Sequence, residues 1–289
     1  MITKAVVAVH YGDPGLCVGL LQNLASVEPE PHHVIIVDHG PSSGLDVRLR
    51  GLHPSFTVLT DWSNPGFGAG CNKGAFFAFN QGAESIWFLN NDARLDRPVL
   101  KTLSDSSRKY PDVVLWGTHQ IENGHLIGAD IQPSWFEQGN QRFLIAELDC
   151  GRILHPRESL SGASIFVTRA GWDLLGPWPT DFFLYFEDAA WCQRAHRAGL
   201  SLGLLELAVA HPRGTTTGRR SPLTTFYGTR NRLLLMADSI PLPNRLPILR
   251  EAGYLLQRRF FRGQWKLLSH TWNGIRAALM GKRGRDPRY

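Results

Sequence analysis

The sequence has little cysteine and no long hydrophobic run, and both shortages limit the classes of protein it can belong to. Its four cysteines, Cys17, Cys71, Cys150 and Cys192, stand far apart and form no Cys-x-x-Cys pair. They therefore indicate neither a disulfide framework nor a zinc site. No segment reaches the roughly 18 apolar residues of a membrane span, and the first residues lack the features of a signal peptide. We expect a cytoplasmic protein with reduced thiols.

Acidic residues are scarce near the C-terminal end. Residues 241–289 contain eleven Lys or Arg against two acidic residues, a net charge of +9, which leaves −3 for residues 1–240 because the whole chain carries +6. The expected partner of this tail is an anionic surface, most plausibly phospholipid or a lipid-linked phosphate, and not nucleic acid. Such a protein could lie peripherally at the inner face of the cell membrane.

The tail also has a helical apolar pattern. Trp265, Leu268, Trp272, Ile275 and Leu279 follow three- and four-residue spacing. The positive charge is supplied by Arg258, Arg259, Arg262, Lys266 and Arg276. This pattern predicts a basic amphipathic helix, which could lie on a membrane or pack its apolar stripe on the catalytic domain. The sequence leaves both possibilities open.

The rest of the chain alternates short apolar runs with helical segments. Strand-like runs cover 5–9, 34–37, 56–60, 113–117, 160–167 and 203–210, and helices are expected over 15–27, 73–81, 98–110 and around 226–235. This order predicts an α/β fold with a mostly parallel sheet flanked by helices. We divide it into a catalytic domain (1–240), with a nucleotide-sugar-binding half (1–118) and an acceptor half (119–240), and a helical tail (241–289).

Three polar residues, Asn90, Asn91 and Asp92, end the apolar run Trp87–Leu89. In an open α/β sheet ligands bind beyond the carboxyl ends of the strands, so Asp92 would lie at the floor of a cleft. One carboxylate suffices to hold Mg²⁺ or Mn²⁺ on a diphosphate. The alternative is a polar turn that has no ligand.

Two further segments of this half could bind a nucleotide. Asp38 ends the second strand, where it could pair with the N3–H of a uracil or thymine ring or merely cap a helix. The glycine-rich segment Asn64–Gly74 would allow backbone N–H groups to approach phosphate or sugar oxygens ahead of a helix. It lacks the third glycine of a dinucleotide fingerprint and the Gly-Lys-Ser/Thr of a P-loop.

A second group of carboxylates follows the aromatic run Phe182–Phe186. Glu187 and Asp188 would begin a helix, where the helix dipole and an apolar surround suit a general base. Ordinary capping is the alternative, because acidic residues favour the first turn of any helix. His211 ends a strand before a polar loop and could contact a metal or diphosphate, or be purely structural. The polar region Ile121–Phe143 is expected to contribute to the acceptor side.

Together these motifs resemble the family 2 glycosyltransferases of the GT-A fold, in particular the bacterial branch with rhamnosyltransferases of cell-surface polysaccharide synthesis. The resemblance spans roughly 4–235 and rests on Ile36–Asp38, Asn64–Gly74, Phe88–Asp92, Phe183–Asp188, His211 and Arg230–Arg232. It departs from the family pattern at three positions: Asn90 stands where many members carry Asp, Gly12 where many carry Asn, and Ala190 where many carry a further Asp. The first departure leaves Asp92 as the one charged residue of the metal motif.

The resemblance implies a role for each matched residue. Asp38 would recognise the pyrimidine base, Asp92 would bind the metal, His211 would lie near the metal or diphosphate, and Asp188, with Glu187 beside it, would serve as the catalytic base. The other residues assigned to donor binding are His10, Gly66, Gly68, Gly70, Asn72, Asn90, Asn91 and Arg230.

The function predicted from the resemblance is transfer of a sugar, with inversion, from a UDP- or dTDP-sugar to a hydroxyl of a saccharide or lipid-linked acceptor. A sugar-nucleotide pyrophosphorylase would need a glycine-rich basic loop after the first strand, and His10–Pro14 has neither character. A non-catalytic relative, which binds nucleotide sugar or serves as a membrane-associated scaffold, is the remaining alternative. It would be favoured if Asp92 or Asp188 were missing.

Overall fold

The computed structural model describes residues 2–41, 44–122, 124–132, 147–211, 221–240 and 245–289. Its main sheet has the strand order β3-β2-β1-β4-β11-β5-β12-β9-β8, and β6 pairs with β5. The strands are β1 (Lys4–His10), β2 (His33–Asp38), β3 (Phe56–Thr60), β4 (Ser85–Leu89), β5 (Val113–Glu122), β6 (His125–Ile127), β8 (Glu147–Leu148), β9 (Gly151–Ile153), β11 (Ser164–Thr168) and β12 (Ser201–Ala210). A small second sheet pairs β7 (Asp130–Ile131) with β10 (Glu158–Ser159).

Strands β1 to β4 are mutually parallel where they pair, and β11 runs antiparallel between β4 and β5. Strand β12 returns parallel to β5. The mixed α/β sheet with a largely parallel centre confirms the expected fold class. Its helices are α1 (Pro14–Val27), α2 (Leu45–Leu49), α3 (Phe67–Asn80), α4 (Leu100–Lys109), α5 (Arg169–Leu175), α6 (Glu187–Arg197), α7 (Pro222–Ser239), α8 (Leu246–Phe261) and α9 (Trp265–Leu279).

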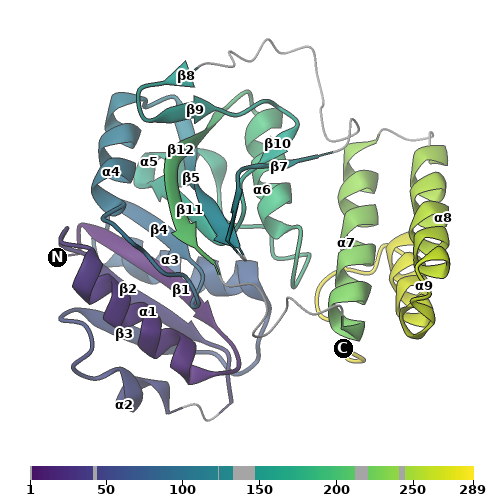
Figure 1. Ribbon diagram of the computed structural model, residues 1–289, viewed down its shortest axis with the longest axis horizontal. Coiled ribbons are helices and arrows are strands. Elements are labelled where there is room, and N and C mark those ends of the chain that lie inside the picture. The colour runs from purple at the N-terminus through teal and green to yellow at the C-terminus, as the bar shows by residue number, and fades with distance from the viewer. Residues whose placement is uncertain (1, 42–43, 123, 133–146, 212–220, 241–244) are drawn as a thin grey trace.

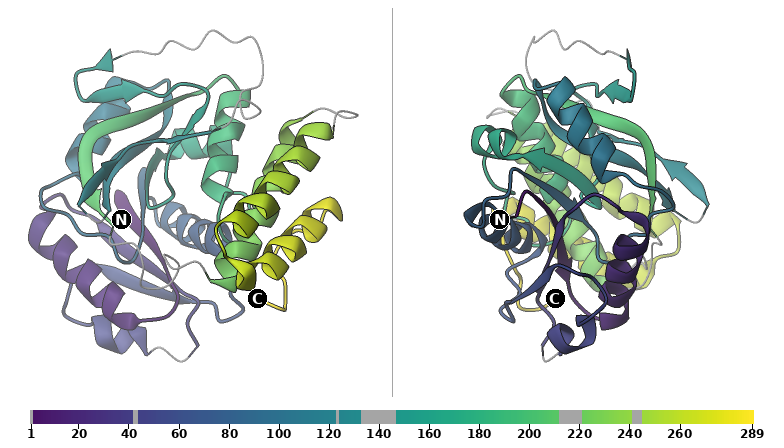
Figure 2. Two further views of the ribbon diagram at one scale, coloured as in Figure 1. Left: turned by 45° about the vertical axis from the view of Figure 1, so that its right-hand side comes forward. Right: turned by 90° about the vertical axis from the view of Figure 1, so that its left-hand side faces the viewer.

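Helices cover both faces of the sheet, as Figures 1 and 2 show. Alternate side chains of each strand point to opposite faces, so Val7 and Val6 of β1 enter different cores. One core buries residues of α3, α5 and α6, and the other buries residues of α1, α2 and α4. Burial on both faces explains why these strands are near-continuous apolar runs in the sequence.

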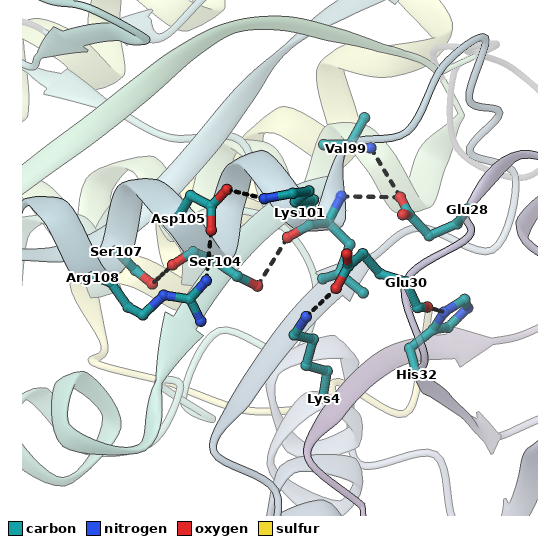
Figure 3. A network of polar contacts seen from close by, with 11 residues as sticks. Lys4, Glu28, Glu30, His32, Val99, Lys101, Ser104, Asp105, Ser107 and Arg108 are labelled. Atoms are coloured by element: carbon teal, nitrogen blue, oxygen red, sulfur yellow. Dashed lines mark hydrogen bonds and ion pairs between the residues drawn. The ribbon is translucent and has the colours of Figure 1, made fainter.

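A buried carboxylate, Glu28, joins two elements of the second core (Figure 3). Its Oε2 accepts hydrogen bonds of 2.9 Å from the N–H groups of Val99 and Leu100, at the start of α4. These N–H groups have no partner inside their own helix, so a carboxylate at this end stabilises α4. The helix begins at Leu100, two residues later than the Pro98 expected from the sequence.

Helices α7, α8 and α9 form a separate group beside the sheet (Figure 1). Ile275 of α9 is buried against Leu233 and Met236 of α7, with Ile248 of α8 in the same cluster. The expected tail helix is therefore present as α9, preceded by a second helix, α8, that the pattern did not single out. The proposed boundary at residue 240 falls between α7 and α8.

Candidate active site

The carboxyl ends of β1, β2 and β4 bring the first group of expected residues together. These strands are parallel, so His10, Asp38 and the segment after Leu89 lie at one edge of the sheet. His10 and Asp38 are direct neighbours in the strand register, and the amide nitrogen of Asn91 lies 3.0 Å from Nδ1 of His10. Burial lowers the pKa of His10, while the nearby carboxylates of Asp38 and Asp13 act in the opposite direction.

Asp38 borders a pocket of about 500 Å³ at this edge. Its Oδ1 accepts a 2.9 Å hydrogen bond from the N–H of Gly40, which fixes the carboxylate at the end of β2. Thr60 and Trp62 line the same pocket, and the Trp62 side chain is exposed. Trp62 was not predicted as a site residue from the sequence. Its position just after the strand β3 is the sequence feature that could have indicated it.

His211 is brought to Asp92 by strand pairing. The backbones of Ala210 and Arg94 exchange hydrogen bonds of 2.9 and 2.8 Å, so the end of β12 lies beside the segment that follows β4. As a result, Nε2 of His211 lies 3.2 Å from Oδ1 of Asp92 and 2.8 Å from the amide nitrogen of Asn90. Two residues predicted from distant parts of the chain thus lie side by side.

Glu122 lies on the other side of the His211 ring, with its Oε1 3.3 Å from Nδ1. Burial alone would lower the pKa of His211, but the carboxylates of Asp92 and Glu122 outweigh it and raise that pKa above its ordinary value. The sequence analysis missed Glu122, although a carboxylate at the end of β5 resembles Asp38 at the end of β2.

The residues around Asp92 fit a divalent cation. Oδ1 of Asp92 is buried and accepts no hydrogen bond of normal geometry from the described residues, although Nε2 of His211 lies beside it at 3.2 Å. When Nδ1–H of His211 donates to Glu122, Nε2 keeps its lone pair, and it lies near both Asn90 and Asp92. Metal-binding histidines commonly have such a carboxylate behind them. Within the described ranges no three His, Cys, Asp or Glu side chains form a metal cluster. A cation here would take its remaining ligands from diphosphate and water.

The loop before β11 connects the Asp92–His211 group to Asp188. The N–H of Gly162 donates a 2.8 Å hydrogen bond to Oδ2 of Asp188, and the carbonyl of Ala163 accepts a 3.0 Å bond from the N–H of Asn90. Strand β11 begins at Ser164, later than the expected Leu160, and this leaves the loop free to bridge the two groups. The two carboxylates that sequence analysis assigned to chemistry therefore lie at the same edge of the sheet.

Asp188 and Glu187 occupy different surroundings. Asp188 is partly exposed, and its Oδ1 also accepts a 2.8 Å bond from the N–H of Ala189. Burial raises the pKa of Asp188, whereas the bonds from Gly162 and Ala189 lower it. Glu187 is buried, and burial together with the charge of Asp188 raises its pKa to about 8. Asp188 is thus the more accessible of the two carboxylates.

The backbone before these carboxylates is strained. Phe183, Tyr185 and Phe186 have φ values of 66°, 69° and 73°. These values lie in the left-handed region, which residues other than glycine rarely adopt. Such a conformation costs about 1–3 kcal/mol per residue and persists only where the surroundings fix it. Strain of this kind clusters at functional sites, so it supports the assignment of the segment that ends in Asp188.

Asn231 and Arg230 of α7 hold this strained segment. The amide nitrogen of Asn231 lies 2.8–2.9 Å from the carbonyl oxygens of Phe182, Leu184 and Tyr185. Arg230 is almost fully buried and donates to the carbonyl of Phe182, to that of Gly284 and to the Asn231 side chain. These contacts of Arg230 are internal, and its expected contact with the donor stays a prediction.

The glycine-rich segment has a packing role that the sequence did not reveal. Helix α3 begins at Phe67, not at the expected Lys73, so Gly68 and Gly70 lie inside its first turn. A Cβ on Gly66 would lie 2.4 Å from the carbonyl oxygen of Phe183, and one on Gly68 would lie 2.5 Å from that of Pro179. The glycines thus allow α3 to pack closely against the segment before Asp188.

Asn72 in the next turn joins the same two segments. Its side chain donates a 2.9 Å bond to the carbonyl of Trp178 and accepts a 2.8 Å bond from the N–H of that residue. Contacts of the donor with Asn72 and with the glycines stay predictions, as do the roles of the other assigned residues.

The segment after α9 returns to the site. The N–H of Gly284 donates to the carbonyl of Asp181, and the guanidinium of Arg285 donates a 3.0 Å bond to the carbonyl of Ser63. Arg285 also lies over the Phe183 ring, at 5.8 Å from the ring centre. We call residues 282–289 the return segment. It contacts Ser63, directly before the glycine-rich segment, and Phe183 of the strained segment before Asp188.

Comparisons with known proteins were made for sequence and for structure. No protein-family model matches the chain. The low-salt glycan biosynthesis hexosyltransferase Agl10 of Haloferax volcanii is 21% identical over 229 residues, which cover 74% of this chain and 70% of the relative. The dTDP-rhamnosyl transferase RfbF of Shigella flexneri is 21% identical over 232 residues, 73% of each chain.

Two solved structures are similar over nearly the whole chain. The mannosyltransferase PcManGT from Pyrobaculum calidifontis, in complex with GDP-Man and Mn²⁺, has a TM-score of 0.55 at 15% identity, covering 96% of this chain and 75% of that one. TarS 1–349 of S. aureus, in complex with UDP, has a TM-score of 0.53 at 12% identity, covering 97% and 92%.

These similarities define the class of protein. The solved structures confirm the GT-A fold, and the curated relatives confirm the enzyme class: the chain is a glycosyltransferase. The resemblance to family 2 glycosyltransferases of the rhamnosyltransferase type, drawn from the sequence motifs, is likewise confirmed.

Proposed function

We propose that this glycosyltransferase moves a sugar from a UDP- or dTDP-sugar to a hydroxyl of a saccharide or lipid-linked acceptor, with inversion at the anomeric carbon. The bridge from Asp188 through Gly162 and Ala163 to Asn90 carries this proposal. It holds a candidate base and a candidate diphosphate site at one edge of the sheet, so the base can act on the acceptor while the other site binds the donor. The relative Agl10 is named for glycan biosynthesis, and the setting that we propose for this chain is cell-surface polysaccharide or glycolipid synthesis.

Asp38 and its pocket would bind the nucleoside. A carboxylate accepts hydrogen bonds and does not donate them, so Asp38 selects a base that presents an N–H, as uracil and thymine do at N3. The neighbouring Trp62 offers an exposed aromatic surface within the same pocket.

Asp188 would take the proton of the acceptor hydroxyl. As that oxygen forms its bond to the anomeric carbon, the bond from this carbon to the diphosphate oxygen breaks, and the electron pair leaves with the nucleoside diphosphate. Attack opposite the leaving group inverts the configuration. Asp92 and His211 would hold a divalent cation, Mg²⁺ or Mn²⁺, which when bound offsets the negative charge of the departing diphosphate.

The first test is thermal stability with UDP, dTDP, GDP, ADP or NAD, each with and without Mn²⁺. A ligand at 100 times its dissociation constant stabilises the native state by about 2.7 kcal/mol. We expect a metal-dependent increase with UDP or dTDP, lost in Asp92→Asn and kept in the matched control Asp96→Asn, an exposed acid nearby. A response to a purine nucleotide or to NAD alone would contradict the assignment of the nucleoside site.

The stereochemistry is tested separately. With the donor identified, NMR spectra recorded during turnover give the anomeric configuration of the first product. Inversion is expected. Retention would contradict the role of Asp188 as a base, because a retaining enzyme does not transfer by one direct displacement.

A further inference from the structure

The apolar side chains of α8 and α9 divide between two sides of the helix pair. On the inner side, Thr271, Gly274, Ile275 and Ala277 of α9 are buried. A Cβ on Gly274 would lie 2.8 Å from the carbonyl oxygen of Phe226, so α9 packs closely against α7. The apolar stripe predicted for the tail is therefore only partly used for packing on the rest of the protein.

On the outer side, large apolar side chains face solvent. Trp265, Trp272 and Leu279 are seven residues apart, about two helical turns, and so form one line along α9. Helix α8 and the end of α9 add further exposed apolar residues. The two helices together carry nine large apolar side chains that are each 49–75% exposed: Leu246, Leu249, Tyr254, Phe260, Phe261, Trp265, Trp272, Leu279 and Met280.

The two helices present these residues together. The rings of Phe260 and Trp265 meet edge to face, with centres 4.7 Å apart, across the turn between α8 and α9. Phe261 adjoins Phe260, at 5.6 Å between ring centres. Figures 1 and 2 show α8 and α9 side by side next to α7. We call this exposed surface of α8 and α9 the aromatic–basic face.

The same face carries unbalanced positive charge. Its exposed cations without an ion pair to any described residue are Arg250, Arg258, Arg262, Lys266 and Arg276. The two acidic residues of the region are engaged, Glu251 with Arg232 at 2.7 Å and Asp286 with Arg288 at 2.8 Å. The basic residues are thus free to interact with an external anion.

We propose that the aromatic–basic face binds the surface of a bilayer that contains anionic phospholipid. Tryptophan and other aromatic rings favour the boundary between headgroups and acyl chains, while Lys and Arg bury their stems and keep their charge at the headgroups. Helices of 16 and 15 residues are about 24 and 22 Å long and can lie flat in this boundary. None of the helices in the described parts of the chain is long and apolar enough to cross a membrane.

The charges and the aliphatic side chains of the face favour a bilayer over a second copy of the chain and over a nucleic acid. A second copy of the chain would bring two basic faces together, and like charges across an interface oppose association. A nucleic acid would satisfy the cations and stack on the rings. It would leave the aliphatic side chains of the same face, Leu246, Leu249 and Leu279, without an apolar partner.

The test is cosedimentation of the full chain with vesicles, without donor or acceptor. Vesicles of phosphatidylcholine alone are compared with vesicles containing 30% phosphatidylglycerol, chosen as a probe, at low and at high salt. Binding is expected only with the anionic vesicles and is expected to weaken at high salt. Equal binding to both compositions, or no binding to either, would overturn the proposal.

Two variants identify the face. Arg258→Gln, Arg262→Gln and Lys266→Gln together should weaken vesicle binding about 100-fold, since each cation near the surface contributes about fivefold. Phe261→Ser, Trp265→Ser and Trp272→Ser should also reduce it. Each triple variant has a matched control that alters three exposed residues elsewhere and should bind as the wild type does. The control for the charge variant combines Arg50→Gln, Arg97→Gln and Arg108→Gln. The control for the apolar variant combines Val47→Ser, Leu126→Ser and Leu174→Ser.

Two further measurements separate the alternatives. Fluorescence anisotropy with a labelled oligonucleotide and light scattering of the free protein report nucleic-acid binding and self-association. The proposal would be overturned if the same residues mediated nucleic-acid binding or self-association and the protein did not bind vesicles. The nucleotide-dependent thermal shift is recorded for every variant, so a failure of vesicle binding is distinguished from a failure of the proposed glycosyl transfer.

Discussion

Asp188 and Glu187 are adjacent in the first turn of α6, yet only one is suited to take a proton at neutral pH. Asp188 accepts bonds from two backbone N–H groups, which favour its charged form, and it is partly exposed. Oε2 of Glu187 is buried and finds no hydrogen-bond partner among the residues described. The exposure and bonding of each carboxylate, not its type, decide which one can serve as the base.

Replacing Asp188 with Asn tests the base. The amide can still accept the bond from Gly162, so the fold and donor binding should persist while kcat falls by about 10²–10⁴. The measurements are single-turnover transfer and the UDP- or dTDP-induced thermal shift. Turnover equal to that of the wild type would refute the assignment.

Replacing Glu187 with Gln tests its raised pKa. Between the ordinary value of 4.5 and about 8, the native state keeps a proton that the unfolded chain has lost. Native stability therefore falls as the pH rises through this window, by at most about 1.4 kcal/mol per pH unit. Gln cannot ionise, so the variant should gain stability relative to the wild type from pH 5 to pH 8.

Urea unfolding at several pH values measures this difference. Glu84→Gln, at an exposed position, provides the control and should follow the wild type. Parallel stability curves for wild type and Glu187→Gln would mean that Glu187 titrates normally in the native state.

Among the elements, α7 has a role that no local pattern indicates. It supplies Asn231, whose amide donates to the carbonyls of the strained segment Phe182–Phe186. Loss of these bonds leaves buried carbonyl groups unsatisfied, at about 1–3 kcal/mol each, and frees the backbone that presents Asp188.

Asn231→Ala should accordingly lower both stability and kcat, with a smaller effect on the affinity for the donor. Glu28→Ala is a matched control, because this buried side chain also holds two backbone groups but lies at the start of α4. The control should lose stability and keep its kcat per folded molecule. If both variants lose kcat in proportion to stability, Asn231 has no positioning role.

Individual elements were predicted well where one local pattern dominated. The expected strand over 56–60 matches the half-buried edge strand β3. Strand β4 ends directly before Asn90, because a fully buried strand is a continuous apolar run that polar residues end. The start of α3 was missed because glycine is a poor helix former, and only the closeness of Phe183 and Pro179 explains its use there.

The site was predicted in part for a similar reason. Asp38 ends a strand, and Asp92 and His211 closely follow strands, positions that are visible in the sequence. The parallel sheet brings Asp38 and Asp92 to one edge. Glu122 behind His211 and Asn231 behind Tyr185 act through contacts between residues far apart in the chain. Such contacts depend on tertiary packing, which one sequence does not specify.

For the whole molecule, the return segment ties the tail (241–289) to the rest of the chain. Tyr289 stacks on Phe226 with ring centres 4.2 Å apart, and the N–H of Asp286 bonds to the Tyr227 hydroxyl. Arg283 pairs with Asp181 and Asp238. Removing residues 241–289 to test membrane binding would also remove these contacts, which is why point variants are preferable.

Deleting residues 282–289 alone should destabilise the protein and reduce transfer. The stacked pair contributes about 0.5–1.5 kcal/mol beyond its buried area, and the bonds of Gly284 to Asp181 and Arg230 add to it. Differential scanning calorimetry and single-turnover transfer give the two effects. An unchanged melting temperature would show that the return segment contributes nothing to the native state.

The sequence separation of these contacts has a consequence for synthesis. Asp181 accepts a bond from Gly284, which is translated about 100 residues later. At about 5–20 residues per second, the strained segment leaves the ribosome roughly 5–20 seconds before this support exists. During that interval the nascent chain has both carboxylates but an unfinished backbone around them, so the order of translation itself delays the formation of a working site.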